Sequence, residues 1–447
     1  MYDLYPYFTN DGSVGLFSPT DDDIYHSTYG ALTESWQKFI IPSHLKEYLE
    51  THHEVKILDI CYGIGYNTKT ALQVFVDNFL KNEKNIKNIN IKKSKNSGPL
   101  TNSIEAIYTD NISSECSSDF SVLQNEICSN ILIDAVDIDK TLINLSPFIK
   151  NSVNNNYFFN KYILKKYLKA DETKNKLLQI KKMAKPKLKP LQKKFRIMNE
   201  IPMIILAKLF GNNLGLSDPI LMSILNSKKY TPFFSKFMLN FARFSLNRGY
   251  NYNKKSKKCA FLHNIYYRYV SKSYKIAKKV LFNTKIDLNF HVDDARRFIQ
   301  STNNTYNFIF LDAFTPAKCP VLWSLDFFNE LYAKLHEDGI ILTYSSSAAV
   351  RNAFLQNGFS VGKIFDKDLN KFIGTVATKN GNLIEYGLDE RDLDLINSKA
   401  GICFKDKNLN LDNSEIIKNR ENEILNSGLV SSTSVLKGHK NDKAESL

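Results

Sequence analysis

The stretch "KILDICYGIGYNTKTAL", residues 56–72, decides the fold of this chain. It opens with an apolar run at 55–60 that is typical of a buried strand, and its apolar spacing at 67–80 is typical of a helix. Gly63 and Gly65 lie between the two, where a backbone without Cβ atoms can pass close to a ligand. The helix that follows offers free N–H groups to an anionic group. This order predicts the ligand-binding edge of a parallel sheet.

Cys61 stands where such a turn usually carries its leading glycine, so a plain strand-to-helix turn remains an alternative. A second strand candidate at 130–139 contains Asp137 near its end, where an acid commonly accepts hydrogen bonds from a ribose diol. The two features together favour a nucleoside with an attached amino acid. A dinucleotide would favour a third glycine to hold its pyrophosphate.

Strand and helix patterns alternate through most of the remaining chain. A helix is expected at 142–149, and the polar stretch at 82–103 is expected to be a surface loop. The later signals are strands at 285–292 and 306–314, a helix at 323–339 that stops at Gly339, a strand at 340–346, a helix at 347–358, and a hairpin of strands at 359–365 and 372–379. This alternation predicts a parallel sheet with helices on both faces. The expected fold is therefore α/β, a doubly wound, Rossmann-like class I methyltransferase sheet with an antiparallel last strand.

The segment 151–285 interrupts this pattern and carries most of the positive charge. It contains 30 Lys or Arg residues against 4 Asp or Glu residues, whereas the rest of the chain has 30 basic and 42 acidic residues. Its apolar spacing predicts a large, basic, mainly helical insertion. Neutralising phosphates and stacking on unpaired bases is one use for such a segment. A lysine-rich insertion merely tolerated on the surface is the alternative. The candidate phosphate contacts are Lys254, Lys255, Lys257 and Lys258.

Composition narrows the class of protein. With 447 residues and 43% hydrophobic residues, the chain can bury a sizeable core. Its six cysteines form no CxxC pair, so the pattern predicts neither a metal site nor a disulfide framework. The N-terminus lacks the features of a signal peptide, and the apolar run at 201–210 is too short to cross a bilayer. A soluble cytoplasmic protein that binds no membrane is expected.

Two further stretches follow strand ends. Asp293 and Asp294 follow the strand at 285–292, where a carboxylate could contact an adenine amino group or simply cap a helix starting at Ala295. In "LDAFTPAKCPVLWS", Asp312 follows a strongly apolar strand, where a carboxylate is costly unless it is used or capped.

The loop after Asp312 is expected to place Lys318 and Trp323 within reach of the pocket mouth as substrate contacts. The stretch at 18–35, with Asp23 and Tyr25, shows no core pattern and predicts a lid or substrate loop. A solvated acidic turn with a helix cap is the alternative interpretation of that stretch.

Several of these motifs resemble one family. "DDIYHS", "GALTES", "YGIGYN", "LDAFTPAKCPVLW" and "GTVAT" occur in the order and setting of the MnmC-like methyltransferases. Members complete the 5-methylaminomethyl group on the wobble uridine of certain tRNAs. The resemblance covers roughly 15–75, 130–150 and 286–435, and the FAD-dependent oxidase domain that some members carry is expected to be absent.

The resemblance implies S-adenosyl-L-methionine as the cofactor, held by Tyr62, Gly63, Gly65, Asn67 and Asp137, with Asp294 as a further candidate. It implies that Asp312, Asp23 and Tyr25 face the aminomethyl group of a tRNA anticodon stem-loop. The enzymes that install that group would act first, and no obligate protein partner is evident.

The expected organisation has five parts. They are an N-terminal substrate or lid region (1–54), the first half of the methyltransferase domain (55–150), the basic insertion (151–285), the second half (286–380) and a C-terminal extension (381–447). Two other functions stay open, namely a small-molecule amine methyl or aminopropyl transferase and a non-catalytic tRNA-binding protein.

Overall fold

The structure, a computed structural model, describes residues 5–11, 13–18, 23–25, 29–96, 128–146, 149, 280 and 282–437. The predicted insertion at 151–285 lies outside these residues up to position 279, and so do its four candidate lysines, Lys254, Lys255, Lys257 and Lys258.

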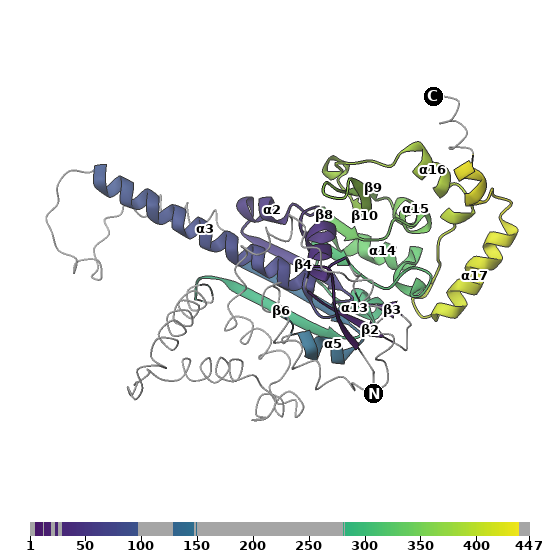
Figure 1. Cartoon of the computed structure of the whole chain (residues 1–447), viewed down its shortest axis with the longest axis horizontal. Coiled ribbons are helices and arrows are strands. Elements are labelled where there is room, and N and C mark those ends of the chain that lie inside the picture. The colour runs from purple at the N-terminus through teal and green to yellow at the C-terminus, as the bar shows by residue number, and fades with distance from the viewer. Residues whose placement is uncertain are drawn as a thin grey trace.

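A seven-stranded sheet forms the centre of the molecule (Figure 1). Its strands, in spatial order, are β6 (Lys285–Val292), β5 (Asn130–Asp137), β4 (Glu54–Ile60), β7 (Tyr306–Leu311), β8 (Leu335–Thr343), β10 (Lys371–Thr378) and β9 (Ser360–Asp366). Neighbouring strands from β6 to β8 are parallel, whereas β10 is antiparallel to both β8 and β9. The predicted doubly wound methyltransferase fold is therefore confirmed.

The chain builds the sheet outward from β4 in two directions. It runs from β4 through β5 to β6 on one side, then returns to place β7 and β8 on the other. Ligands of such sheets bind at the carboxyl ends of the strands where this reversal occurs. The glycine turn after β4 lies at that point.

Helices cover both faces of the sheet. They are α3 (Tyr66–Asn96), α5 (Lys140–Leu145), α13 (Ala295–Ser301), α14 (Leu325–Lys334) and α15 (Ala348–Gln356), followed by α16 (Glu390–Ile396) and α17 (Asn413–Asn426). Short 3-10 turns span Pro320–Leu322 (η3), Gly381–Leu383 (η4) and Lys399–Gly401 (η5). Because side chains alternate along a strand, Ile57 of β4 shares a core cluster with Phe75 of α3, and Leu58 shares the opposite cluster with Phe327 of α14.

The N-terminal region forms a separate small sheet and a helical segment. Its elements are β1 (Tyr5–Phe8), β2 (Val14–Ser18), β3 (Asp23–Ile24), α1 (Ala31–Ser35), the π-helix η1 (Trp36–Ile40) and α2 (Leu45–Thr51). The expectation that 18–35 has no core pattern is wrong for its last part, because Ala31 and Leu32 are buried in one cluster with Ile64 and Tyr66 of the glycine turn. The N-terminal region thus rests directly on that turn.

Two predictions give the wrong type of element, and the helix expected at 142–149 instead spans Lys140–Leu145 as α5. The stretch from 82 to 96 is helical, because α3 meets no glycine or proline before Gly98, and Figure 1 shows its far end projecting from the sheet. Gly339 does not stop a helix, because α14 ends at Lys334 and the buried Leu335 already pairs with Tyr306 as the start of β8.

Candidate functional site

A cavity of about 620 Å³ lies at the carboxyl ends of β6, β5, β4, β7 and β8. The described residues that line it are strongly acidic, although the whole chain carries a formal charge of +14. Seven lining residues are acids and two are bases. The acids are Glu34, Asp137, Asp139, Asp293, Asp294, Asp312 and Asp412, and the bases are Lys38 and Arg296. Such a cavity favours a cationic ligand.

The glycine turn is bound to the end of β5. Gly63 and Gly65 have φ values of 58° and 80°, in the left-handed region that favours glycine. The Gly63 N–H donates to Asp137 Oδ2 at 2.7 Å, and the Asp139 N–H donates to Asp137 Oδ1 at 2.8 Å. Burial raises the pKa of Asp137 to about 6, against the opposing effect of these hydrogen bonds. Its contact with a ribose remains a prediction.

Cys61 adopts the backbone conformation of the glycine it replaces, with φ at 62°. Its side chain lines the cavity, and burial raises the pKa of its thiol well above the ordinary value. The neighbouring Tyr62 is only 4% exposed, and its phenol hydrogen-bonds the Ser146 hydroxyl at 2.5 Å. The turn therefore keeps its shape although the leading glycine is missing.

Asp59, inside β4, is a residue that the sequence reasoning missed. Its Oδ2 accepts hydrogen bonds from the backbone and hydroxyl of Thr68, while its buried Oδ1 has no hydrogen-bond partner among the described residues. Burial raises its pKa to about 8. The signal was available, since a carboxylate within the apolar run "KILDI" is costly without a partner. It adds a buried acid beside the turn.

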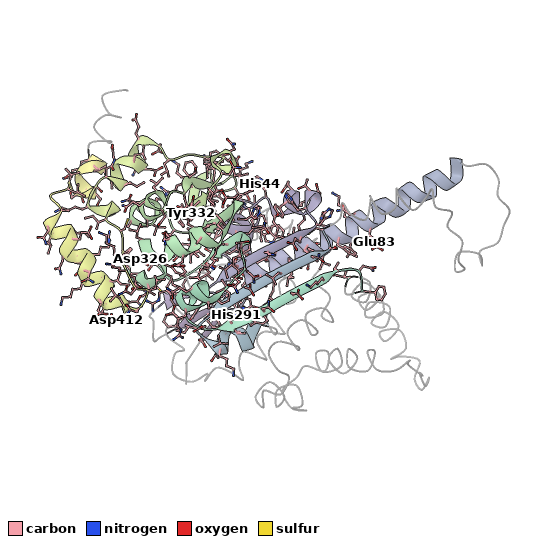
Figure 2. All side chains as sticks on the ribbon, turned by 180° about the vertical axis from the view of Figure 1, so that it is seen from behind. His44, Glu83, His291, Asp326, Tyr332 and Asp412 are labelled. Carbon is pink, nitrogen blue, oxygen red and sulfur yellow. The ribbon has the colours of Figure 1, made fainter. Side chains whose placement is uncertain are left out.

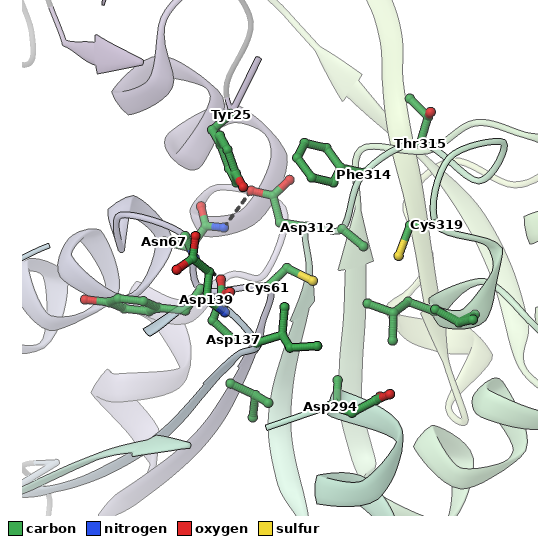
Figure 3. Close-up of a pocket in the computed structure, with 18 of the residues that line it drawn as sticks. Tyr25, Cys61, Asn67, Asp137, Asp139, Asp294, Asp312, Phe314, Thr315 and Cys319 are labelled. Carbon is green, nitrogen blue, oxygen red and sulfur yellow. Dashed lines mark hydrogen bonds between the residues drawn. The ribbon is translucent and has the colours of Figure 1, made fainter. Parts of the chain in front are cut away.

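Asp312 lies beside the glycine turn, across the boundary between β4 and β7 (Figure 3). Its Oδ2 accepts a hydrogen bond from Asn67 Nδ2 at 3.1 Å, and its N–H donates to the carbonyl of Ile60. The ring of Tyr25 lies 5.1 Å from that of Phe314 and covers this end of the cavity. The structure thus brings together Asp312, Asn67 and Tyr25, which lie far apart in the sequence.

Asp294 caps α13, as the alternative interpretation predicted. Its Oδ1 accepts from the Arg296 N–H at 2.9 Å, and its carboxylate pairs with the Arg296 guanidinium at 2.7 Å. Burial alone would raise the pKa of Asp294, but Arg296 holds it below the ordinary value. An adenine contact by Asp294 stays a prediction.

The C-terminal extension supplies part of the cavity wall, which the sequence did not reveal. Arg296 also pairs with the buried Asp406 at 2.7 Å, and the Asp406 N–H donates to Asp326 of α14. These bonds hold the start of α17, with Asp412 and Asn413, against the cavity. Asp326 and Asp412 can be located in Figure 2.

The loop after β7 corrects one prediction. Trp323 is fully buried, and its indole N–H donates to the carbonyl of Phe314 at 2.8 Å. It packs under the loop and does not lie at the pocket mouth, because burying an aromatic ring of this size in the core is strongly favourable. Lys318 is exposed in the same loop, outside the residues that line the cavity. Asp23 starts β3, but its side chain lies outside the described part of the chain.

Residues 257–380 match a family of S-adenosyl-L-methionine-dependent methyltransferases. The chain is related to these methyltransferases. The match includes Asp294 and Asp312, together with the strands β6, β7, β8, β9 and β10. The cofactor of this family is S-adenosyl-L-methionine, as the resemblance implied.

Curated relatives agree with the predicted resemblance. The chain is 33% identical over 136 residues to an uncharacterised protein of Methanocaldococcus jannaschii, covering 30% of this chain and 38% of that one. It is 32% identical over 80 residues to the tRNA 5-methylaminomethyl-2-thiouridine biosynthesis bifunctional protein MnmC of Burkholderia vietnamiensis, covering 18% and 12%. The MnmC of Campylobacter fetus is 30% identical over 84 residues, covering 19% and 14%. The matches thus span well under half of each relative.

Among solved structures, MnmC2 of Aquifex aeolicus aligns with 95% of this chain and 86% of its own length, with 18% identity and a TM-score of 0.48.

The cavity suits the cofactor of this family. S-adenosyl-L-methionine carries a sulfonium and an ammonium group, and the cavity walls are rich in carboxylates. The left-handed glycines leave the backbone of the turn open to a ligand. Within the described ranges, no group of three or more His, Cys, Asp or Glu side chains could hold a metal ion. Nor does any helix in that part of the chain have the length and apolarity to span a membrane.

Proposed function

We propose that this methyltransferase methylates the primary amine of a 5-aminomethyl group on the wobble uridine of tRNA, giving 5-methylaminomethyluridine or its 2-thio form. The observation that carries the proposal is the Asn67–Asp312 hydrogen bond. It joins the carboxylate that follows β7 to the first turn of α3, which comes directly after the glycine turn, so an amine held by Asp312 would lie beside the cofactor.

The chemistry assigns separate tasks to the residues at this end. S-adenosyl-L-methionine, when bound, supplies an electrophilic methyl group. An alkylamine has a pKa near ~10 and must lose a proton before it can react. Asp312 holds the amine in position and accepts that proton, while Asn67 fixes the orientation of the carboxylate. Correct approach of reactants can account for ~7–11 kcal/mol of an activation barrier. Tyr25 and Asp23 are candidates for covering the acceptor.

Three observations favour tRNA as the partner. The MnmC relatives carry tRNA 5-methylaminomethyl-2-thiouridine biosynthesis in their names. The insertion at 151–285 concentrates 30 basic residues, which suits phosphate contacts to an anticodon stem-loop. The acidic cavity would repel phosphates, so only an uncharged or cationic group of the RNA would enter it. Enzymes that install the aminomethyl group would act earlier, and the cytoplasm is the expected compartment.

Nucleoside mass spectrometry tests this proposal directly. Transfer RNA that carries 5-aminomethyluridine is incubated with the protein and S-adenosyl-L-methionine, then digested and analysed. We expect a gain of one methyl group on that nucleoside and none on tRNA that lacks the aminomethyl group. Cofactor binding without methylation of this nucleoside would refute the assignment of the acceptor. Absence of both methylation and cofactor binding would leave a non-catalytic tRNA-binding protein.

The acidic cavity also favours a second candidate, the methylation of a free small amine. That function assigns no task to the basic insertion. Turnover of a free alkylamine in the absence of RNA, at a rate that added tRNA does not change, would support it over the first.

A further inference from the structure

A second carboxylate lies at the β7–β8 end of the cavity, apart from Asp312. It belongs to Glu34 of α1, and it is joined there by Lys38 of η1 and by Tyr344, the residue after β8. All three side chains line the same cavity as Asp312. The proposed function gives them no role.

These three residues form a compact arrangement. Lys38 Nζ lies 2.8 Å from Glu34 Oε1 and 5.4 Å from the centre of the Tyr344 ring. The Glu34 side chain is only 13% exposed and that of Lys38 is 20% exposed. The Tyr344 hydroxyl donates to the carbonyl of Ala313, the residue after Asp312, at 2.8 Å. The ring is therefore held in place against the loop that carries the acceptor carboxylate.

A carboxylate beside an aromatic face is a binding site for an ammonium ion. The carboxylate contributes a charge-assisted hydrogen bond, and the ring face attracts the same cation. Lys38 occupies this site with its own primary ammonium group, which is the chemical group of the proposed acceptor. The internal occupant thus indicates what kind of ligand the site accepts.

The local backbone also marks this position. Lys38 lies in a π-helical turn, Trp36–Ile40, closed by a hydrogen bond from the Ile41 N–H to the Trp36 carbonyl. Such turns are rare overall and occur frequently at functional sites. Lysine has a flexible four-carbon stem, so its ammonium can leave the site without moving the backbone.

We propose that Glu34 and Tyr344 form an ammonium subsite, which Lys38 fills until the acceptor amine displaces it. This inference rests on the proposed function, because it specifies how that function recognises its acceptor. Glu34 would then select acceptors that carry a cationic amine, before Asp312 takes the proton. Lys38 would act as an internal competitor of the acceptor.

Two substitutions test the subsite in the full chain. We expect Glu34→Gln to raise the KM for aminomethylated tRNA about ten-fold or more, because a charge-assisted hydrogen bond is removed. Lys38→Met should lower that KM several-fold, because the competitor is gone. In both variants the Kd for S-adenosylhomocysteine should stay unchanged. Glu47→Gln and Lys46→Met, on the exposed face of α2, are the matched controls.

The direction of the Lys38→Met effect is decisive. If Lys38 instead contacted RNA phosphates, its removal would raise the KM for tRNA and overturn the proposal. An unchanged KM in Glu34→Gln would overturn it as well. Should Glu34→Gln fail to fold, as thermal melting would reveal, Lys38→Met still decides between the two outcomes.

Ethylammonium provides a test without RNA. Calorimetric titration in the presence of S-adenosylhomocysteine should detect ethylammonium binding to Lys38→Met, and the Glu34→Gln/Lys38→Met double variant should bind it at least about ten-fold more weakly. Binding that depends on Glu34, without any tRNA methylation, would mean that the proposed function fails and the subsite stands. Binding that does not depend on Glu34 would refute the subsite whatever the tRNA result.

Discussion

Gly65→Ala is the substitution that tests the glycine turn most directly. Gly65 has a φ of 80°, and an ideal Cβ there would lie 2.2 Å from the Tyr62 hydroxyl oxygen and 2.7 Å from Ser146 Oγ. Tyr62 cannot move aside into solvent, because it is only 4% exposed and packs in the core. The new methyl group must therefore break the Tyr62–Ser146 hydrogen bond or reshape the turn.

The magnitude follows from three costs. A non-glycine residue in the left-handed region costs roughly 1–2 kcal/mol. Overpacking costs roughly 1–3 kcal/mol, and a broken hydrogen bond about 1 kcal/mol. We expect Gly65→Ala to lower the free energy of unfolding by about 3–6 kcal/mol in total. Affinity for S-adenosylhomocysteine should fall as well, because the turn that faces the cofactor is displaced.

Gly63→Ala is the matched control. Gly63 has a φ of 58°, but an added Cβ would meet only the Cys61 carbonyl oxygen, at an ordinary 3.8 Å. Only the conformational cost of roughly 1–2 kcal/mol remains. Denaturant unfolding and calorimetric titration of S-adenosylhomocysteine would compare the two variants. Equal reductions of stability in both would refute the reasoning, because steric overlap with Tyr62 would then be irrelevant.

Three other predictions concern the acids and the insertion. Asp312→Asn should reduce turnover at least about 100-fold while leaving the Kd for S-adenosylhomocysteine within about two-fold, because general-base help is removed; a matching fall in affinity would contradict this. The pKa of Asp59 in the folded protein is about 8, above the ordinary value of 3.8. Between these two values the folded protein keeps a proton that the unfolded chain releases. The free energy of unfolding should therefore fall as the pH rises from about 4 to about 8. Asp59→Asn should flatten that pH dependence in thermal melts, and an unchanged slope would contradict the assignment. The last prediction replaces four lysines of the insertion by Gln, namely Lys254, Lys255, Lys257 and Lys258. The slope of log affinity for tRNA against log salt concentration should become shallower by about 0.7 for each phosphate that is no longer neutralised. An unchanged slope would exclude these lysines as phosphate contacts.

Local sequence patterns predicted the sheet because the conformations of strands and turns depend mainly on residues that are close together in sequence. The strand at 285–292 has the predicted bounds, and the antiparallel hairpin closes the sheet as expected. Gly63 and Gly65 also adopt the positive φ values that such a turn requires. Each of these features is encoded by residues that are close together in the chain.

The misses concern contacts between distant segments. Trp323 follows a polar, proline-containing loop, yet the core formed by other elements takes it in completely. Asp412 lines the cavity in a segment that Arg296 binds through Asp406, which lies 110 residues from Arg296 in sequence. Lys38 of the N-terminal region lies over the ring of Tyr344, which follows β8. No local pattern records which surfaces will meet in this way.

Cys61 and Cys319 both line the cavity, so their thiols must coexist with a reactive cofactor. S-adenosyl-L-methionine is an alkylating agent, and a thiolate is among the nucleophiles most readily alkylated. Burial raises the pKa of Cys61 well above its ordinary value and that of Cys319 to about 11, so both remain neutral thiols at physiological pH. The burial that raises the pKa of Cys61 therefore keeps its thiol from being methylated by the cofactor.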